Sequence, residues 1–259
     1  VAARRLGRPS WTPADAPDSF APAPDADSVV QRAALLGRLG LREEAQRELD
    51  ALAKTTATGP ERLLAIANAL RANGRASQGI QLARRALANG APADARTYRL
   101  LYPLIHRDAL LAETAEQKLD PSFVAALIRQ ESMFNPGATS PAGARGLMQV
   151  MPDLGGKLAE ALAYPLWDPV LLYQPDVSLQ LGVFHLQELL SRYPRPVEVL
   201  AAYNAGARRV DRWSQRLGVE DPEIFAERIP FVETRGYVRV IQRNQELYRV
   251  LYRFEEGRL

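Results

Sequence analysis

Glu131 is placed where a carboxylate can work as an acid. It ends a stretch whose apolar residues recur at helical spacing, namely Phe123, Val124, Leu127 and Ile128. Glu131 is the next position on the same stripe, so its side chain is expected to point to the buried side of its helix. Burial disfavours the charged form of a carboxyl, which then stays protonated nearer neutral pH and can donate a proton to a leaving group. The alternative is a glutamate that ends an apolar face and turns to solvent.

The helix that holds Glu131 has local signals at both ends. Asp120 followed by Pro121 predicts a helix start, because a side-chain cap is followed by a residue that needs no hydrogen-bond partner there. The run Asn135-Pro136-Gly137 predicts that the helix has ended just past Glu131.

Four segments share an order along the chain. They are ESMFNP at 131–136, SPAGARGLMQVMP at 140–152, AYNAG at 202–206 and IPFVETRGYV at 229–238. This set resembles the catalytic domain of the soluble lytic transglycosylases, the SLT family, whose fold is similar to goose-type lysozyme. The resemblance covers roughly residues 98–255.

The resemblance implies an enzyme that cleaves peptidoglycan without consuming water. In this family one glutamate protonates the bond between N-acetylmuramic acid and N-acetylglucosamine. It then acts as base while the C6 hydroxyl of the muramic acid attacks C1, leaving a 1,6-anhydro end. By resemblance Glu131 is that acid and base, and no cofactor is implied.

The resemblance also implies residues that bind the sugars. Tyr203 and Ser140 correspond to positions near the acetamido group, and Gln149 and Met151 to positions that line the glycan groove. Without the motif around it, Tyr203 would be read as a core tyrosine, and Ser140, which precedes a proline, as a turn residue.

Asn204 and Glu233 have two interpretations each. Asn204 either hydrogen-bonds in the site or holds the turn at Gly206. Glu233 either stabilises the dipole of the helix that it begins or holds the groove near Glu131, where its charge would raise the pKa of that group.

Two other functions stay open. A hydrolytic lysozyme on the same fold would need a second carboxylate, and the acidic residues after Glu131 match no such motif (Asp153, Asp168, Asp176 and Glu198). A wall-binding scaffold would use the helical repeats to hold a protein partner.

The chain is expected to be all-α, in three parts. Residues 1–27 carry five prolines without periodicity and predict an extended or disordered leader. Residues 28–97 predict a helical repeat similar to tetratricopeptide repeats, since Gly40 and Gly74 lie 34 residues apart and Leu36 matches Leu70 at the same offset. Residues 98–259 predict the lysozyme-like catalytic domain.

The composition of the chain limits the classes of partner that it is expected to bind. The net charge of +3 suits an anionic polymer such as a cell wall, whereas the arginines are scattered at helical surface positions and predict no nucleic-acid surface. No apolar run is long enough to span a membrane, and a signal peptide is either absent or already removed. The substrate class predicts a periplasmic location. Neither His106 nor His185 has a neighbour at metal-ligand spacing, so no metal is expected.

Overall fold

The computed structural model describes residues 11–218 and 220–254. The chain divides into two compact units, residues 1–103 and 104–259, which are described separately. Regular structure in the described residues is helical, and backbone pairing of the β type is limited to isolated bridges such as Ala14 with Asp94. The prediction of an all-α protein is confirmed.

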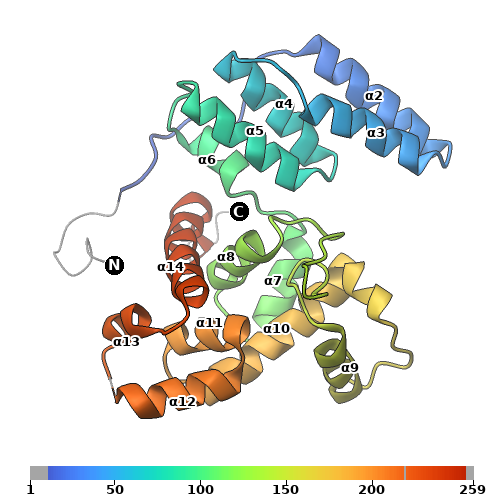
Figure 1. Cartoon of the computed structure of the whole chain (residues 1–259). Helices are drawn as coiled ribbons and strands as arrows, with labels where there is room; N and C mark the ends of the chain where they lie inside the picture. Colours follow the sequence, from blue (N-terminus) through green and yellow to red (C-terminus); the bar gives the residue numbers. More distant parts are fainter. Residues whose placement is uncertain (1–10, 219, 255–259) are drawn as a thin grey trace. The chain divides into compact units, whose positions relative to one another are not determined.

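The first unit consists of two helical hairpins and a short helix (Figure 1). The hairpins pair α2 with α3 and α4 with α5, and α6 packs against α4 and α5. The helices are α2 (Pro24–Arg38), α3 (Arg42–Ala53), α4 (Pro60–Ala72), α5 (Ala76–Ala88) and α6 (Ala95–Leu101). Helix α2 therefore begins at Pro24, inside the segment expected to be a leader.

The two hairpins turn in the same way. Gly40 and Gly74 have φ of 80° and 73°, a region that glycine enters without a steric penalty. The amide of Leu41 donates to the carbonyl of Leu36 at 2.9 Å, and the amide of Arg75 donates to the carbonyl of Leu70 at 2.8 Å. Both are the 6→1 bond of a Schellman turn, so the 34-residue offset in the sequence recurs as a repeated turn. A relation to tetratricopeptide arrays stays a prediction.

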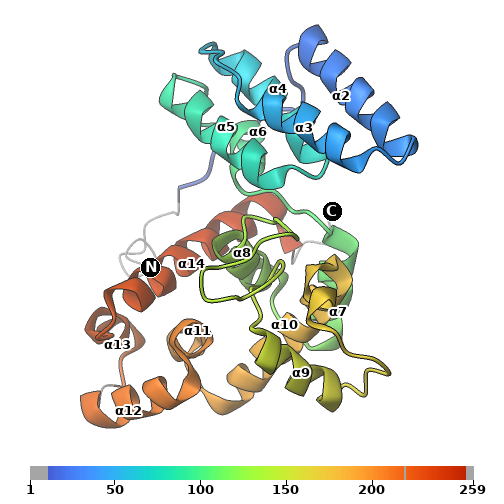
Figure 2. The same cartoon turned by 45° about the vertical axis from the view of Figure 1, so that its right-hand side comes forward.

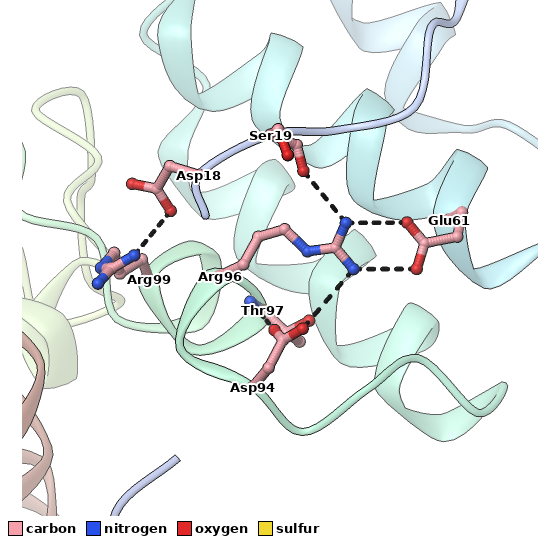
Figure 3. A network of polar contacts seen from close by, with 7 residues as sticks. All are labelled: Asp18, Ser19, Glu61, Asp94, Arg96, Thr97 and Arg99. Atoms are coloured by element: carbon pink, nitrogen blue, oxygen red, sulfur yellow. Dashed lines mark hydrogen bonds and ion pairs between the residues drawn. The ribbon is translucent and has the colours of Figure 1, made fainter. Parts of the chain in front are cut away.

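Residues 11–23 form an extended arm that packs on α6, while residues 1–10 lie outside the described part. The arm is held by a polar network around Arg96 (Figure 3). The guanidinium of Arg96 donates to both carboxyl oxygens of Glu61 at 3.0 Å and to the carbonyl of Ser19 at 3.1 Å. Nearby, Arg99 pairs with Asp18 at 3.0 Å. The proline-rich segment is therefore extended and ordered over these residues.

Helix α6 belongs to the first unit. Its Leu100 and Leu101 are buried in the same apolar cluster as Leu63 and Leu64 of α4. The boundary expected between residues 97 and 98 falls within this helix, and the division between the units comes after residue 103. The difference has a simple cause, since the apolar side of α6 faces the helical repeat.

The second unit places α8 beside α14, with α11 beneath them in both views (Figures 1 and 2). Helix α11 also packs against α10, α12 and α13. The elements are α7 (Arg107–Glu116), α8 (Pro121–Glu131), α9 (Pro152–Ala161), the 3-10 helix η1 (Pro169–Tyr173), α10 (Pro175–Arg192), α11 (Pro196–Ala205), α12 (Ala207–Leu217), α13 (Pro222–Arg228) and α14 (Val232–Tyr252). Most of these helices begin with proline, which lacks the N–H that would be unpaired at that position.

Among the described residues, no helix is both long and apolar enough to cross a membrane.

Candidate active site

Helix α8 holds Glu131 at its last position. Its first turn is capped by Asp120, whose carboxylate accepts from the amide of Ser122 at 2.8 Å. The other oxygen of Asp120 accepts from Arg249 of α14 at 2.6 Å. Residues 122–129 of α8 are all buried, so the helix is fixed along its whole length. Both ends of this helix lie where the sequence predicted them.

Glu131 is half-buried, and its carboxyl group accepts a hydrogen bond from the hydroxyl of Tyr237 on α14. Burial raises the pKa of Glu131 from about 4.5 to about 7, although the hydrogen bond from Tyr237 opposes the shift. The bond occupies Oε1, and no partner of Oε2 occurs in the described part of the chain. Oε2 is therefore the oxygen that can present a proton to a bound ligand.

The loop after α8 is tied back to the end of that helix. The buried hydroxyl of Ser132 donates to the carbonyl of Leu147 at 2.8 Å. Gly146 lies directly against η1, and a Cβ added to it would lie 1.8 Å from the carbonyl oxygen of Leu172. With φ of 78° as well, this position accepts only glycine. The loop that carries residues 140–151 is thus held rigidly beside Glu131.

Tyr203 of α11 is close enough to Glu131 for the two charges to interact. Burial raises the pKa of Tyr203 well above its usual value, and the charge of Glu131 raises it further. The hydroxyl of Tyr203 donates to the carbonyl of Met148 at 2.7 Å. Because its one proton is used, its oxygen can only accept from a ligand, as from the N–H of an acetamido group.

Three polar residues of the predicted site already make hydrogen bonds that limit what they can offer a ligand. Asn204 accepts from Thr234 at 2.7 Å through Oδ1, which leaves its amide N–H groups to donate. Ser140 accepts from the amide of Ala144 at 3.0 Å, which leaves its hydroxyl proton to donate. Gln149 donates to the carbonyls of Ala138 and Gly146, which leaves its oxygen to accept.

Met151 and Glu233 are exposed. Met151 precedes α9 and exposes 42% of its surface, and Glu233 lies in the first turn of α14. Burial, and not Glu233, raises the pKa of Glu131. The expectation that Glu233 would help to raise it therefore has no support, whereas its place at the helix start agrees with a favourable interaction with the helix dipole. Met148, by contrast, is fully buried core.

The four acidic residues considered for a hydrolytic mechanism have other neighbours. Asp168 caps η1, and Glu198 is buried against Arg195 and Ser214. Asp176 lies close enough to His106 and Glu113 to influence their pKa values, and Asp153 is exposed at the start of α9. None of the four is a cause of the shift at Glu131.

No group of three or more His, Cys, Asp or Glu residues suited to hold a metal ion occurs within residues 11–218 and 220–254.

Comparison with known proteins shows which family the second unit is similar to. Residues 108–225 match the family model of the transglycosylase SLT domain. This stretch of the chain is similar to the transglycosylase SLT domain. The resemblance seen in the sequence is therefore confirmed. The matched residues include Glu131 and Tyr203, whereas Tyr237 lies beyond them on α14.

The curated relatives are longer than the chain. Over 159 residues the chain is 35% identical to the soluble lytic murein transglycosylase of Escherichia coli strain K12. The aligned stretch makes up 60% of this chain and 24% of the relative. The chain spans about a quarter of the length of the first curated relatives that it matches.

Solved structures of soluble lytic transglycosylases have the same lysozyme-like helical fold. The 70 kDa enzyme from Escherichia coli matches with a TM-score of 0.79 and 27% identity, over 99% of this chain and 40% of that one. Its complex with bulgecin A matches with a TM-score of 0.80 and 28% identity, with the same coverage. An inactive mutant of the enzyme Slt from Pseudomonas aeruginosa matches with a TM-score of 0.74 and 28% identity, over 96% and 40% of the two chains.

Tyr237 is the residue of the site that the sequence did not single out. It lies on the stripe of α14 that also carries Ile241, Tyr248 and Leu251, all of them buried. A tyrosine on such a buried face is usually a packing residue. Its place in the segment 229–238 was the one signal that pointed to the site.

Proposed function

We propose that the SLT domain of this chain is a peptidoglycan lytic transglycosylase. The observation that carries the proposal is a single carboxyl group, Glu131, with a pKa raised to about 7 by burial and with one oxygen held by Tyr237. A group with this pKa is partly protonated at neutral pH and is equally able to take the proton back. This is what one residue needs in order to act first as acid and then as base.

In the proposed reaction, Glu131 gives up one proton and later takes one back. Its carboxyl gives a proton to the oxygen between N-acetylmuramic acid and N-acetylglucosamine, and the bond from C1 to that oxygen breaks. The C6 hydroxyl of the muramic acid attacks C1, and the carboxylate takes the proton of that hydroxyl. Tethering of the nucleophile removes most of the entropy cost of the second step. The product carries a 1,6-anhydro end, and Glu131 is protonated again.

The proposed roles of the neighbouring residues follow from the hydrogen-bonding groups that they leave unused. Tyr203 accepts from the acetamido N–H, and Ser140 donates to the acetamido oxygen. Asn204 donates to the glycan and Gln149 accepts from it. Met151 supplies an exposed apolar surface for a sugar ring, and Glu233 lies at the rim of the site. Tyr237 stabilises the carboxylate after it has given up its proton.

A hydrolytic lysozyme is the second candidate, and the surroundings of Glu131 disfavour it. Hydrolysis uses a second carboxylate placed roughly 5–10 Å from the first. A charge that close would be a further cause of the raised pKa of Glu131, and no other carboxylate of the described chain contributes to that shift. The periplasm is the proposed location, since that is where peptidoglycan lies. A protein partner for residues 28–97 stays a prediction.

A digest of purified peptidoglycan tests the function. The wild-type chain is expected to release muropeptides that end in 1,6-anhydro-muramic acid, and Glu131→Gln to release none. Glu160→Gln is the matched control, because Glu160 is an exposed carboxylate of α9. Products with reducing ends, heavier by one water, would instead establish a hydrolase. Full activity of Glu131→Gln would remove Glu131 from the acid role.

A further inference from the structure

Helix α12 carries a row of arginines on its outer face. Its inner face packs through Val210 and Trp213, which are buried. With 3.6 residues per turn, Arg208, Arg212 and Arg216 fall within an arc of about 80° on the opposite side. All three are exposed. We call them the α12 arginine face. In both views α12 lies at the edge of its unit (Figures 1 and 2).

Among the described residues, the α12 arginine face has no acidic partner. Within residues 11–218 and 220–254 none of its three members takes part in an ion pair. Some exposed arginines on other helices do, as Arg47 does with Glu43 on α3, whereas Arg38, Arg42 and Arg84 do not in the described part of the chain. The one acidic residue of α12, Asp211, accepts instead from Arg192 and from Tyr193. With four arginines and one aspartate, α12 carries a net charge of +3, equal to the formal net charge of the whole chain.

This arrangement does not favour the helix itself. Like charges at i and i+4 destabilise a helix, and both successive pairs of the α12 arginine face have this spacing. Arg208 also lies in the first turn, where the helix dipole favours negative charge. Arg209, in the same turn, is different: it donates to the carbonyl of Ala205 at 2.7 Å and lies over the ring of Phe231. A negative partner from outside the chain would remove both penalties.

The α12 arginine face begins near the site. Gly206 alone separates α11, which carries Tyr203, from α12. Five residues of chain span at most about 18 Å, so the Cα atoms of Tyr203 and Arg208 lie within that distance. From Arg208 the face then runs along α12 for about 12 Å, at a rise of 1.5 Å per residue. A polymer bound at Tyr203 can therefore reach it.

We propose that the α12 arginine face binds the carboxylates of peptidoglycan stem peptides, so that an anionic sacculus is held next to the site. The inference rests on the proposed function for its ligand. Arginine suits this ligand, because the planar guanidinium matches a carboxylate in two parallel hydrogen bonds. Three exposed contacts of this kind together correspond to roughly a tenfold gain in affinity.

Binding of the full chain to purified sacculi tests this proposal. All proteins carry Glu131→Gln, so that the polymer is not cut. The test variant adds Arg208→Gln, Arg212→Gln and Arg216→Gln, since glutamine has a helix propensity close to that of arginine. The control variant adds Arg38→Gln, Arg42→Gln and Arg84→Gln, three exposed arginines of the first unit. Circular dichroism melting checks that both variants are folded.

At low salt the test variant is expected to bind sacculi roughly tenfold more weakly than its parent. The control variant is expected to match the parent. The difference should vanish at about 1 M salt, where screening acts over about 3 Å. On glycan strands stripped of their peptides by an amidase, all three proteins should bind alike.

Several results would overturn the proposal. They are equal binding of the test variant and its parent, an equal loss in the control variant, or an undiminished difference on stripped strands. Tighter binding of the parent to phosphatidylglycerol vesicles than to sacculi, lost in the test variant, would assign the face to a membrane instead. Failure of the proposed function is seen separately, as the absence of anhydro products from the wild-type digest.

Discussion

Replacing Glu131 by glutamine is expected to stabilise the protein at alkaline pH. Burial raises the pKa of Glu131 to about 7 in the folded state, against about 4.5 for an ordinary glutamate. Because the folded state has the higher pKa, it favours the protonated carboxyl. The contribution of Glu131 to stability is therefore complete below about pH 4.5 and is lost as the pH rises through 7. A shift of roughly 2.5 pKa units corresponds to about 3 kcal/mol. Glutamine still accepts from Tyr237 and does not ionise.

The assay is denaturant unfolding of the wild type and of Glu131→Gln between about pH 4 and pH 8. Tryptophan fluorescence follows the second unit through Trp167 and Trp213. The difference in the free energy of unfolding is expected to be near zero at pH 4 and to approach about 3 kcal/mol in favour of the variant at pH 8. Glu160→Gln should change stability by less than about 1 kcal/mol at either pH. A difference for Glu131→Gln that is the same at both ends of the range would refute the argument from burial.

Three further outcomes are expected. Tyr237→Phe removes a hydrogen bond that lowers the pKa of Glu131. In a plot of cleavage rate against pH, the alkaline limb should therefore move to higher pH, while the maximal rate falls roughly 10- to 100-fold. An alkaline limb at the same pH as in the wild type would contradict the role of Tyr237. Gly146→Ala should lower the free energy of unfolding by more than about 3 kcal/mol, whereas Gly143→Ala, with φ of 90° and open space around it, should cost only about 1–2 kcal/mol; equal losses would show that contact with Leu172 does not matter. Asp120→Ala should cost about 1–2 kcal/mol, because α8 loses its cap and Arg249 keeps only Glu246 as an acidic partner among the described residues; thermal melting measures it, and an unchanged Tm would show that the cap is dispensable.

The helix of Glu131 could be predicted from the sequence because its signals are local. The pair Asp120-Pro121 and the breaker after Phe134 define the ends, and the apolar spacing defines the buried side. The buried stripe of α14 follows from the same periodicity. These features depend on residues a few positions apart, which a linear sequence displays directly.

The partners of the site residues could not be predicted in this way. Tyr237 reaches Glu131 from 106 positions away, and helical periodicity identifies a buried face without naming what that face meets. Gln149 was expected to bind sugars, yet its amide group also donates to the carbonyls of Ala138 and Gly146 in its own loop, which the linear sequence does not reveal. The arm was predicted to lack helical periodicity, but proline content gives no information about its contact with α6.

The arm has a consequence for synthesis of the chain. Its contacts join residues 77 and 81 positions apart, Ser19 to Arg96 and Asp18 to Arg99. At translation rates of about 5–20 residues per second, the arm waits about 4–16 s for its partner helix to be made. Each helical hairpin of the first unit can form during that interval from neighbouring residues. A proline-rich segment suits the delay, because it forms neither a helix nor the centre of a sheet while it waits. Docking of the arm is therefore the step that completes the first unit.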